Sequence, residues 1–145
     1  MKRAILLLTT IAIYTTTTLR AQTFTAGDAI IEANIEVSNP TSFGISYEQG
    51  IWQINNDFAV GVGGVIDIIP YRHDTSFEMQ GIGSLHWTRV RDFDFYTGLQ
   101  LGYVQSHAGR LGVDFALGAR YYFNSTWAIT ANVNRGFTLG VTLKL

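Results

Sequence analysis

Apolar residues alternate with small or polar residues along the last third of the chain, a pattern typical of a β-strand with two different faces. One face carries Leu111, Val113, Phe115, Leu117, Ala119, Tyr121 and Phe123, and the other carries Gly112, Asp114, Ala116, Gly118, Arg120 and Tyr122. This alternation is longer than the usual strand of about 5–6 residues and suits a strand that crosses a bilayer at a tilt. The segment therefore predicts a membrane-crossing strand.

The same alternation recurs in eight segments, which are separated by short turns rich in Asn, Asp, Gly and Pro. We expect strands at approximately Ala26–Val37, Ser42–Trp52, Phe58–Ile69, Ser76–Thr88, Phe93–Ser106, Arg110–Phe123, Trp127–Asn134 and Phe137–Leu145. Short connections favour antiparallel pairing of each strand with the next. The pattern predicts an all-β, eight-stranded antiparallel up-and-down barrel with short turns on both sides.

The distribution of glycine indicates which strand face lies inside the barrel. Seven glycines fall on the polar faces, namely Gly61, Gly63, Gly98, Gly102, Gly112, Gly118 and Gly140. An eight-stranded barrel has an interior that side chains alone can fill, so glycine there leaves room for Tyr96 and Arg120. We therefore expect a polar, side-chain-filled lumen and an apolar outer face against lipid. A soluble exported barrel with its apolar face around a ligand is the alternative that this distribution disfavours.

Aromatic residues gather near the two ends of the expected strands. Trp52, Phe58, Trp87, Phe95, Phe123 and Trp127 flank one set of turns, and Phe43, Phe77, Tyr103 and Phe137 lie near the opposite strand ends. Two aromatic belts separated by an aliphatic middle match the girdles that membrane barrels place at the two membrane interfaces. The aromatic pattern thus favours a transmembrane barrel.

The first 21 residues have the pattern of a cleavable export signal. Lys2 and Arg3 precede an apolar stretch that is too short for a membrane anchor, and Ala21 provides a small residue at the expected cut. We expect residues 1–21 to be the signal peptide and residues 22–145 to form the barrel domain. No cysteine lies near the cut, so a lipid-anchored lipoprotein is excluded.

Composition excludes several classes of function. Three of the 10 basic residues lie in the expected signal, so residues 22–145 carry seven basic and 11 acidic residues, a net charge of −4. A nucleic-acid partner would need a basic stripe that this chain lacks. The absence of cysteine excludes disulfides and thiolate metal sites, and no phosphate-binding loop or other cofactor motif occurs.

The export signal, the eight alternating segments, the Tyr121-Tyr122-Phe123-Asn124 strand end and the terminal strand resemble small Gram-negative outer-membrane barrels of the OmpA-transmembrane and OmpX type. The resemblance covers residues 22–145 and implies a monomer in the outer membrane, with both termini on the periplasmic side. It places the turns near Asn39, Arg72, Ala108 and Arg135 on the outer side. Such proteins commonly end in an aromatic residue, whereas this chain ends in Leu145.

Charged residues on the polar faces predict two groups of interacting side chains. We expect a lumen network of Glu32, Glu36, Glu48, Asp67, Glu78, His86, Asp114 and Arg120, because buried charges must be paired. At the outer rim, the guanidinium groups of Arg72, Arg110 and Arg135 match the geometry of phosphate groups. We therefore expect outer-membrane lipid, and lipopolysaccharide in particular, as the partner of this rim.

We expect no catalytic, cofactor or metal site. Ser84 and His86 share a face, but lipid A deacylases would need the order His-x-Ser, and Glu78 lies too far along the same strand to complete a triad. Glu48 from a neighbouring strand can orient His86. The sequence favours a structural, envelope-maintaining or surface-interaction role; a lipid A deacylase-like or acyltransferase-like enzyme and a soluble ligand-binding barrel are the alternatives.

Overall fold

The structure is a computed structural model that describes residues 23–71, 74–105 and 110–145, with only the backbone described at 104, 105 and 110. The expected signal peptide and Arg72 lie outside the described residues. The strands are β1 (Ala29–Val37), β2 (Ser42–Asn55), β3 (Phe58–Pro70), β4 (Thr75–Trp87), β5 (Phe93–Gln105), β6 (Arg110–Tyr122), β7 (Trp127–Val133) and β8 (Phe137–Lys144).

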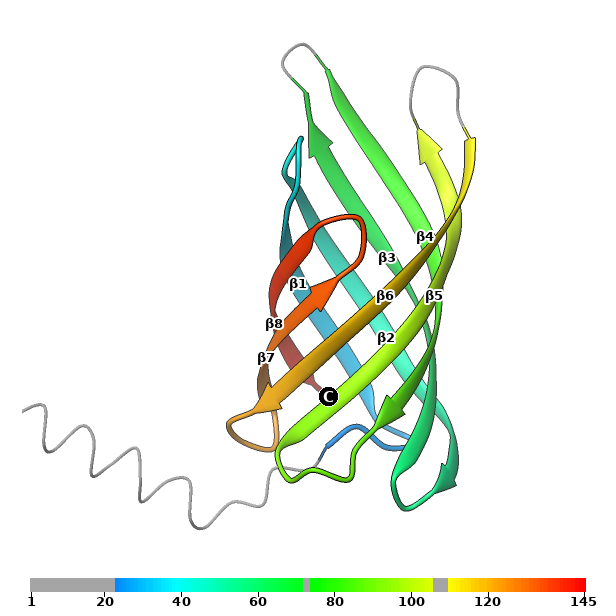
Figure 1. The fold of residues 1–145 in the computed structure, drawn as a ribbon, viewed down its shortest axis with the longest axis vertical. Coiled ribbons are helices and arrows are strands. Elements are labelled where there is room, and N and C mark those ends of the chain that lie inside the picture. Colours follow the sequence, from blue (N-terminus) through cyan, green and yellow to red (C-terminus); the bar gives the residue numbers. More distant parts are fainter. Residues whose placement is uncertain (1–22, 72–73, 106–109) are drawn as a thin grey trace, which may run out of the picture.

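The eight strands form a closed barrel in which each strand pairs antiparallel with the next (Figure 1). β1 and β8 close it, with a register that runs from Ile30 opposite Lys144 to Val37 opposite Phe137. This arrangement confirms the predicted fold class. Among the described residues, no helix is long and apolar enough to cross a membrane.

Two strand boundaries differ from the prediction by three residues, and the other differences are of one residue. β1 begins at Ala29 rather than near Ala26, because residues 23–28 fold back and hydrogen-bond outside the ladder. β2 continues to Asn55 through two register shifts against β3, one between Gly50 and Trp52 and one further along. Such irregularities interrupt simple alternation, so sequence periodicity alone ended this strand too early.

The two ends of the barrel differ in shape. We call the end that holds Thr23 and Leu145 the near mouth, and the opposite end the far mouth (Figure 1). β3 to β6 each contain 13 residues, whereas β7 and β8 contain seven and eight. The β7–β8 turn therefore ends lower than the β3 and β4 strand ends (Figure 1). Arg135, in this turn, pairs with the buried Glu78.

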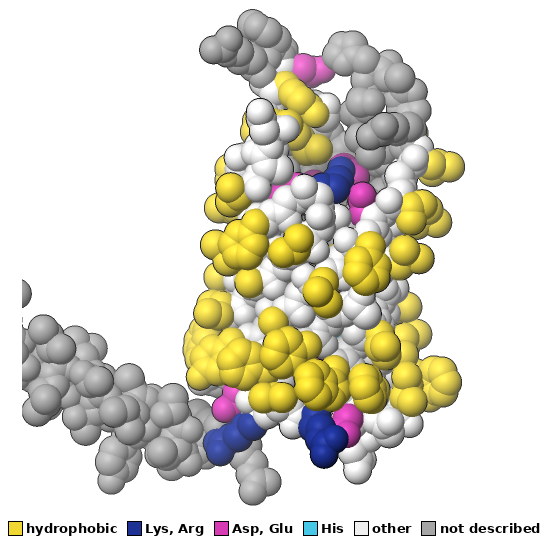
Figure 2. Space-filling model, viewed as in Figure 1, with side chains coloured by type: hydrophobic (Ala, Val, Ile, Leu, Met, Phe, Trp, Pro, Cys, Tyr) yellow, Lys and Arg dark blue, Asp and Glu magenta, His cyan; other side chains and the backbone are white. Residues whose placement is uncertain are grey.

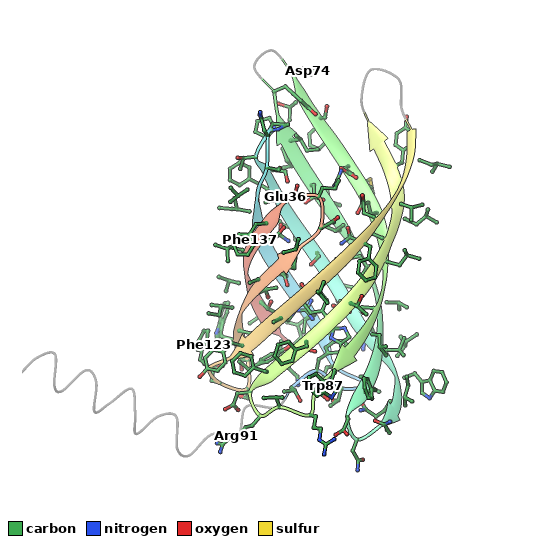
Figure 3. All side chains as sticks on the ribbon, in the orientation of Figure 1. Glu36, Asp74, Trp87, Arg91, Phe123 and Phe137 are labelled. Atoms are coloured by element: carbon green, nitrogen blue, oxygen red, sulfur yellow. The ribbon has the colours of Figure 1, made fainter. Side chains whose placement is uncertain are left out.

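The outer surface is apolar over most of its height. Leu111, Val113, Phe115 and Leu117 on β6 are each more than 60% exposed, as expected for side chains that face lipid. Hydrophobic side chains cover the outside of the barrel wall in Figure 2, and charged side chains gather toward its ends. Trp87 and Phe123 lie at the lower end of the barrel in Figure 3, and Phe137 lies higher on the wall.

The interior is polar. The fully or nearly buried polar side chains include Glu32, Glu48, Glu78, His86, Asp94 and Arg120, all of which lie on strands. This distribution, polar inside and apolar outside, is opposite to that of a soluble barrel with a greasy ligand cavity. The structure therefore contradicts the soluble ligand-binding alternative.

Candidate functional site in the barrel interior

Arg120 is the centre of the buried charge network. Its side chain is 4% exposed, and its guanidinium donates to Glu48 Oε2 at 3.0 Å, Asp94 Oδ2 at 3.3 Å and Glu32 Oε2 at 3.4 Å. The three acids come from β2, β5 and β1, so one side chain from β6 links four strands across the lumen. A guanidinium suits this position because its five donors lie in a rigid plane.

His86 extends the network toward the near mouth. Its Nδ1 lies 2.9 Å from Asp94 Oδ1, and its Nε2 lies 2.7 Å from Glu48 Oε1. Both ring nitrogens face carboxylate oxygens, and only a doubly protonated ring can donate to both. Arg120 and a protonated His86 together offset most of the charge of Glu32, Glu48 and Asp94. We call these five residues the central cluster.

Aromatic packing holds Arg120 in place. The guanidinium carbon lies 4.2 Å from the centroid of the Tyr96 ring, a cation–π contact. Asn132 Nδ2 donates to the Tyr96 hydroxyl at 3.1 Å, which fixes the ring from the other end. Gly118 makes this possible, since a Cβ at that position would overlap the Tyr96 ring. The glycine on the polar face thus gives room to a larger neighbour, as predicted.

Ser84, His86 and Asp94 lie in the order of a catalytic triad. Ser84 Oγ is 2.9 Å from His86 Nε2, and Asp94 lies on the other side of the ring. However, Glu48 Oε1 accepts hydrogen bonds from both the Ser84 hydroxyl and His86 Nε2. The serine proton is therefore directed to a carboxylate rather than to the imidazole that would have to act as its general base.

The surroundings also disfavour catalysis at Ser84. Ser84 is 6% exposed and His86 is fully buried, so no lipid ester can reach the hydroxyl from the outer face. The cavity beside them has a volume of about 50 Å³ and is lined by Glu32, Glu48, Tyr96 and Arg120 among others. A cavity needs roughly 10–15 Å³ on this measure to hold one water molecule, so this one holds a few waters but no lipid substrate. The arrangement is a filled lumen rather than a substrate pocket.

A second group of charges lies near the far mouth. Arg135, from the β7–β8 turn, donates to Glu78 Oε2 at 2.9 Å and lies 3.5 Å from Asp114 Oδ2. Gln80 Nε2 donates to both carboxylates, and Asp67 lies opposite Glu78 in the β3–β4 register. Among the described residues, no group of three or more acidic or histidine side chains is arranged to hold a metal ion.

The pKa of Arg135 lies above its usual value. Burial alone would lower this pKa, but the hydrogen bond with Glu78 and the negative charges of Glu78, Asp114 and Glu36 outweigh the effect of burial. The guanidinium therefore remains charged at any pH the protein meets. Glu36 and Arg135 also line a cavity of about 260 Å³ at this end, together with Ser42 and Tyr71.

The predicted site residues thus divide into two places. The structure places Glu32, Glu48, His86 and Arg120 in the central cluster, and Glu78, Asp114 and Arg135 at the far mouth. Of the expected phosphate-contacting rim, Arg72 and the side chain of Arg110 lie outside the described residues. Arg135 turns inward to two acids, with 39% of its side chain exposed.

Sequence reasoning missed two participants. Asp94 is not among the expected network residues, although the register of His86 opposite Tyr96 brings it next to the imidazole. Phe24 had no predicted role, yet its ring lies 4.2 Å from the His86 ring. Aligning the expected fourth and fifth strands in register would have placed Asp94 beside His86. No periodic pattern in the sequence marks Phe24.

The closed fold, the apolar exterior and the ion-paired interior define a small eight-stranded barrel of the transmembrane type. The chain belongs to the family described as Domain of unknown function (DUF2715), whose model matches residues 9–145. No curated protein matches this sequence.

Solved structures share the fold at low sequence identity. A de novo designed transmembrane β-barrel matches with a TM-score of 0.64 and 11% identity, covering 86% of this chain and all of the designed chain. The N-terminal β-barrel domain of OprF from Pseudomonas aeruginosa matches with a TM-score of 0.57 and 13% identity, covering 83% of this chain and 98% of that one. Ail, the attachment invasion locus protein of Yersinia pestis, matches with a TM-score of 0.55 and 12% identity, covering 83% and 99%. These likenesses show the fold.

Proposed function

We propose that this protein is a small integral outer-membrane barrel with a closed lumen, which acts structurally in the envelope or through its surface. The observation that carries the proposal is the central cluster, because Arg120 ties four strands together across the barrel interior. A conducting porin needs a wider barrel with an aqueous channel. An enzyme would need an accessible nucleophile, which Ser84 is not.

The outer-membrane location rests on three features of the chain. A predicted export signal directs it out of the cytoplasm, the outward face is apolar, and the fold is shared with the OprF barrel domain and Ail. Closure of β1 on β8 leaves no unpaired sheet edge between them, which lipid requires of a spanning sheet.

Mobility in denaturing gels and conductance test this proposal together. Protein extracted from purified outer membranes should migrate differently before and after boiling, because a closed barrel resists detergent until it is heated. The same preparation in a planar lipid bilayer should give at most very small currents. Steady porin-sized currents would overturn the closed lumen, and a soluble protein without a mobility shift would overturn the membrane barrel.

We extend the proposal to lipopolysaccharide as a partner of the outer rim, on the basis of the phosphate-matching geometry of arginine. Arg135 is already paired with Glu78 and Asp114, so we propose that Arg72 and Arg110 make the contact with lipopolysaccharide. The double variant Arg72→Gln/Arg110→Gln should retain less lipopolysaccharide through purification, whereas Arg135→Gln alone should retain as much as the unaltered protein. Unchanged retention in the double variant would overturn this extension.

A further inference from the structure

Residues Thr23–Asp28, directly ahead of β1, fold across the near mouth of the barrel. Phe24 is fully buried there and packs with Ile30 and Ala59, two inward-facing strand residues that are also buried. Its ring centroid lies 4.2 Å from that of His86, so the phenyl group covers the central cluster from the near side. Phe24 therefore fills a buried, largely apolar site at the near mouth, next to the central cluster.

Hydrogen bonds and an ion pair hold the same segment in place. Lys144, near the end of β8, lies 2.7 Å from Asp28 Oδ2 and donates to the Thr23 carbonyl oxygen at 3.1 Å. Asp28 Oδ2 also accepts from the backbone nitrogen and the hydroxyl of Thr25, at 2.7 and 2.8 Å. The anchors flank Phe24 on both sides in the sequence, which fixes the segment across the opening.

The barrel wall is shaped to receive this segment. The Gly50 backbone nitrogen donates to the Asp28 carbonyl oxygen at 2.8 Å, and its carbonyl oxygen accepts from the Gly27 nitrogen at 2.9 Å. A Cβ at Gly50 would overlap the Thr25 carbonyl oxygen, so only glycine allows this close approach. By contrast, a Cβ at Gly83 would meet nothing within 4 Å.

We propose that the near mouth is a binding site for a short, turn-forming peptide segment with an aromatic side chain, and that residues Thr23–Asp28 of the same chain occupy it as a plug. The plug and the central cluster are then two closures in series, and the lumen opens only at the far mouth. The proposal goes beyond the closed lumen of the proposed function, since the central cluster can block passage whether or not the plug is present.

Thiol labelling can test the plug because the chain contains no cysteine. Ala59→Cys places a reporter thiol in contact with Phe24, and Ser125→Cys places one on an exposed turn at the same end. In the full-length protein, a water-soluble maleimide should label Ser125→Cys rapidly and Ala59→Cys slowly. Adding Phe24→Ala should speed the labelling of Ala59→Cys by about tenfold or more, because the site is then open to water. Phe123→Ala, which removes an outward-facing phenyl group, should leave that labelling slow.

A second pair of variants tests the receiving wall. Gly50→Ala should displace the segment and speed the labelling of Ala59→Cys, whereas Gly83→Ala should not. The mobility shift on boiling shows that each variant is folded, and Ile30→Cys replaces Ala59→Cys as reporter if the latter does not fold. Rapid labelling of the reporter with Phe24 intact would overturn the plug, as would slow labelling after Phe24→Ala. Neither result would bear on the conductance test of the closed lumen.

Discussion

The two ends of the lumen differ in how far their charged side chains are shielded from water. In the near half, Arg120 and His86 meet Glu48 and Asp94 with every partner less than 10% exposed, and the buried Phe24 ring packs against His86 on the near-mouth side. In the far half, Arg135 meets the buried Glu78 and the partly exposed Asp114 beside an open cavity, with 39% of the Arg135 side chain exposed.

The difference predicts which half of the lumen is more sensitive to the loss of a charged partner. Charges that are fully desolvated depend on their protein partners, whereas charges beside water can be solvated when a partner is lost. The near half should therefore tolerate little change, and the far half should tolerate much more. Four predictions test this contrast.

The largest effect is expected at Arg120. Arg120→Met leaves Glu32, Glu48 and Asp94 buried without their guanidinium, and breaking a buried pair in this way costs about 3–5 kcal/mol of unfolding free energy. Urea unfolding of the protein in lipid vesicles measures the loss. Arg89→Gln is the matched control, because the Arg89 side chain is 72% exposed and its pair with Asp57 spans 3.9 Å. Equal stability of Arg120→Met and the control would contradict the account.

The next effect is expected at Phe24. Phe24→Ala removes a fully buried phenyl group and should lower the unfolding free energy by about 3 kcal/mol, the lower end of the range for buried aromatic residues. The same urea titration measures it. Phe123→Ala, which removes an outward-facing phenyl group, should lower the unfolding free energy clearly less. A larger loss of stability in Phe123→Ala than in Phe24→Ala would contradict this prediction.

A smaller effect is expected at Arg135. The Arg135 side chain is partly exposed, and the fully buried Glu78 keeps the Gln80 amide as a donor, so Arg135→Gln should cost about 2 kcal/mol, less than Arg120→Met. This loss should shrink further in high salt, which screens exposed pairs more than buried ones. A loss as large as that of Arg120→Met would show that the far half is as dependent on its ion pairs as the near half.

The smallest effect is expected at Ser84. In Ser84→Ala the Glu48 carboxylate keeps Arg120 and His86 as donors, so the unfolding free energy should fall by about 1 kcal/mol, the usual contribution of one hydrogen bond. No esterase activity should be lost, because none is expected of the unaltered protein. Hydrolysis of a lipid ester by the unaltered protein that disappears in Ser84→Ala would establish the enzyme alternative.

Much of this architecture follows from alternation along the strands. The alternation from Leu111 to Leu117 predicted which side chains of β6 face outward. Arg120 was expected to pair with acids in the lumen, because a buried guanidinium needs charged partners. Those inferences use only the fixed period of two along a strand, which a single sequence displays directly.

Contacts that depend on register or on folding back were not predictable in the same way. Asp94 reaches His86 through the offset between β4 and β5, and a shift of that register would give it another neighbour. Phe24 lies before the first strand, where no period assigns a face. Its burial depends on Gly50 and Lys144, which lie far from it in the sequence.

The position of tryptophan in a bilayer tests the central claim most directly. Trp52, Trp87 and Trp127 all face outward, with exposed fractions of 63%, 39% and 43%, and all lie in the aromatic belt near one end of the barrel. In vesicles of brominated lipids, their fluorescence should be quenched most by bromine close to the headgroups and less by bromine at the bilayer centre. Strong quenching of this kind is the result that a membrane-spanning barrel predicts. Fluorescence unaffected by bromine at any depth would contradict it.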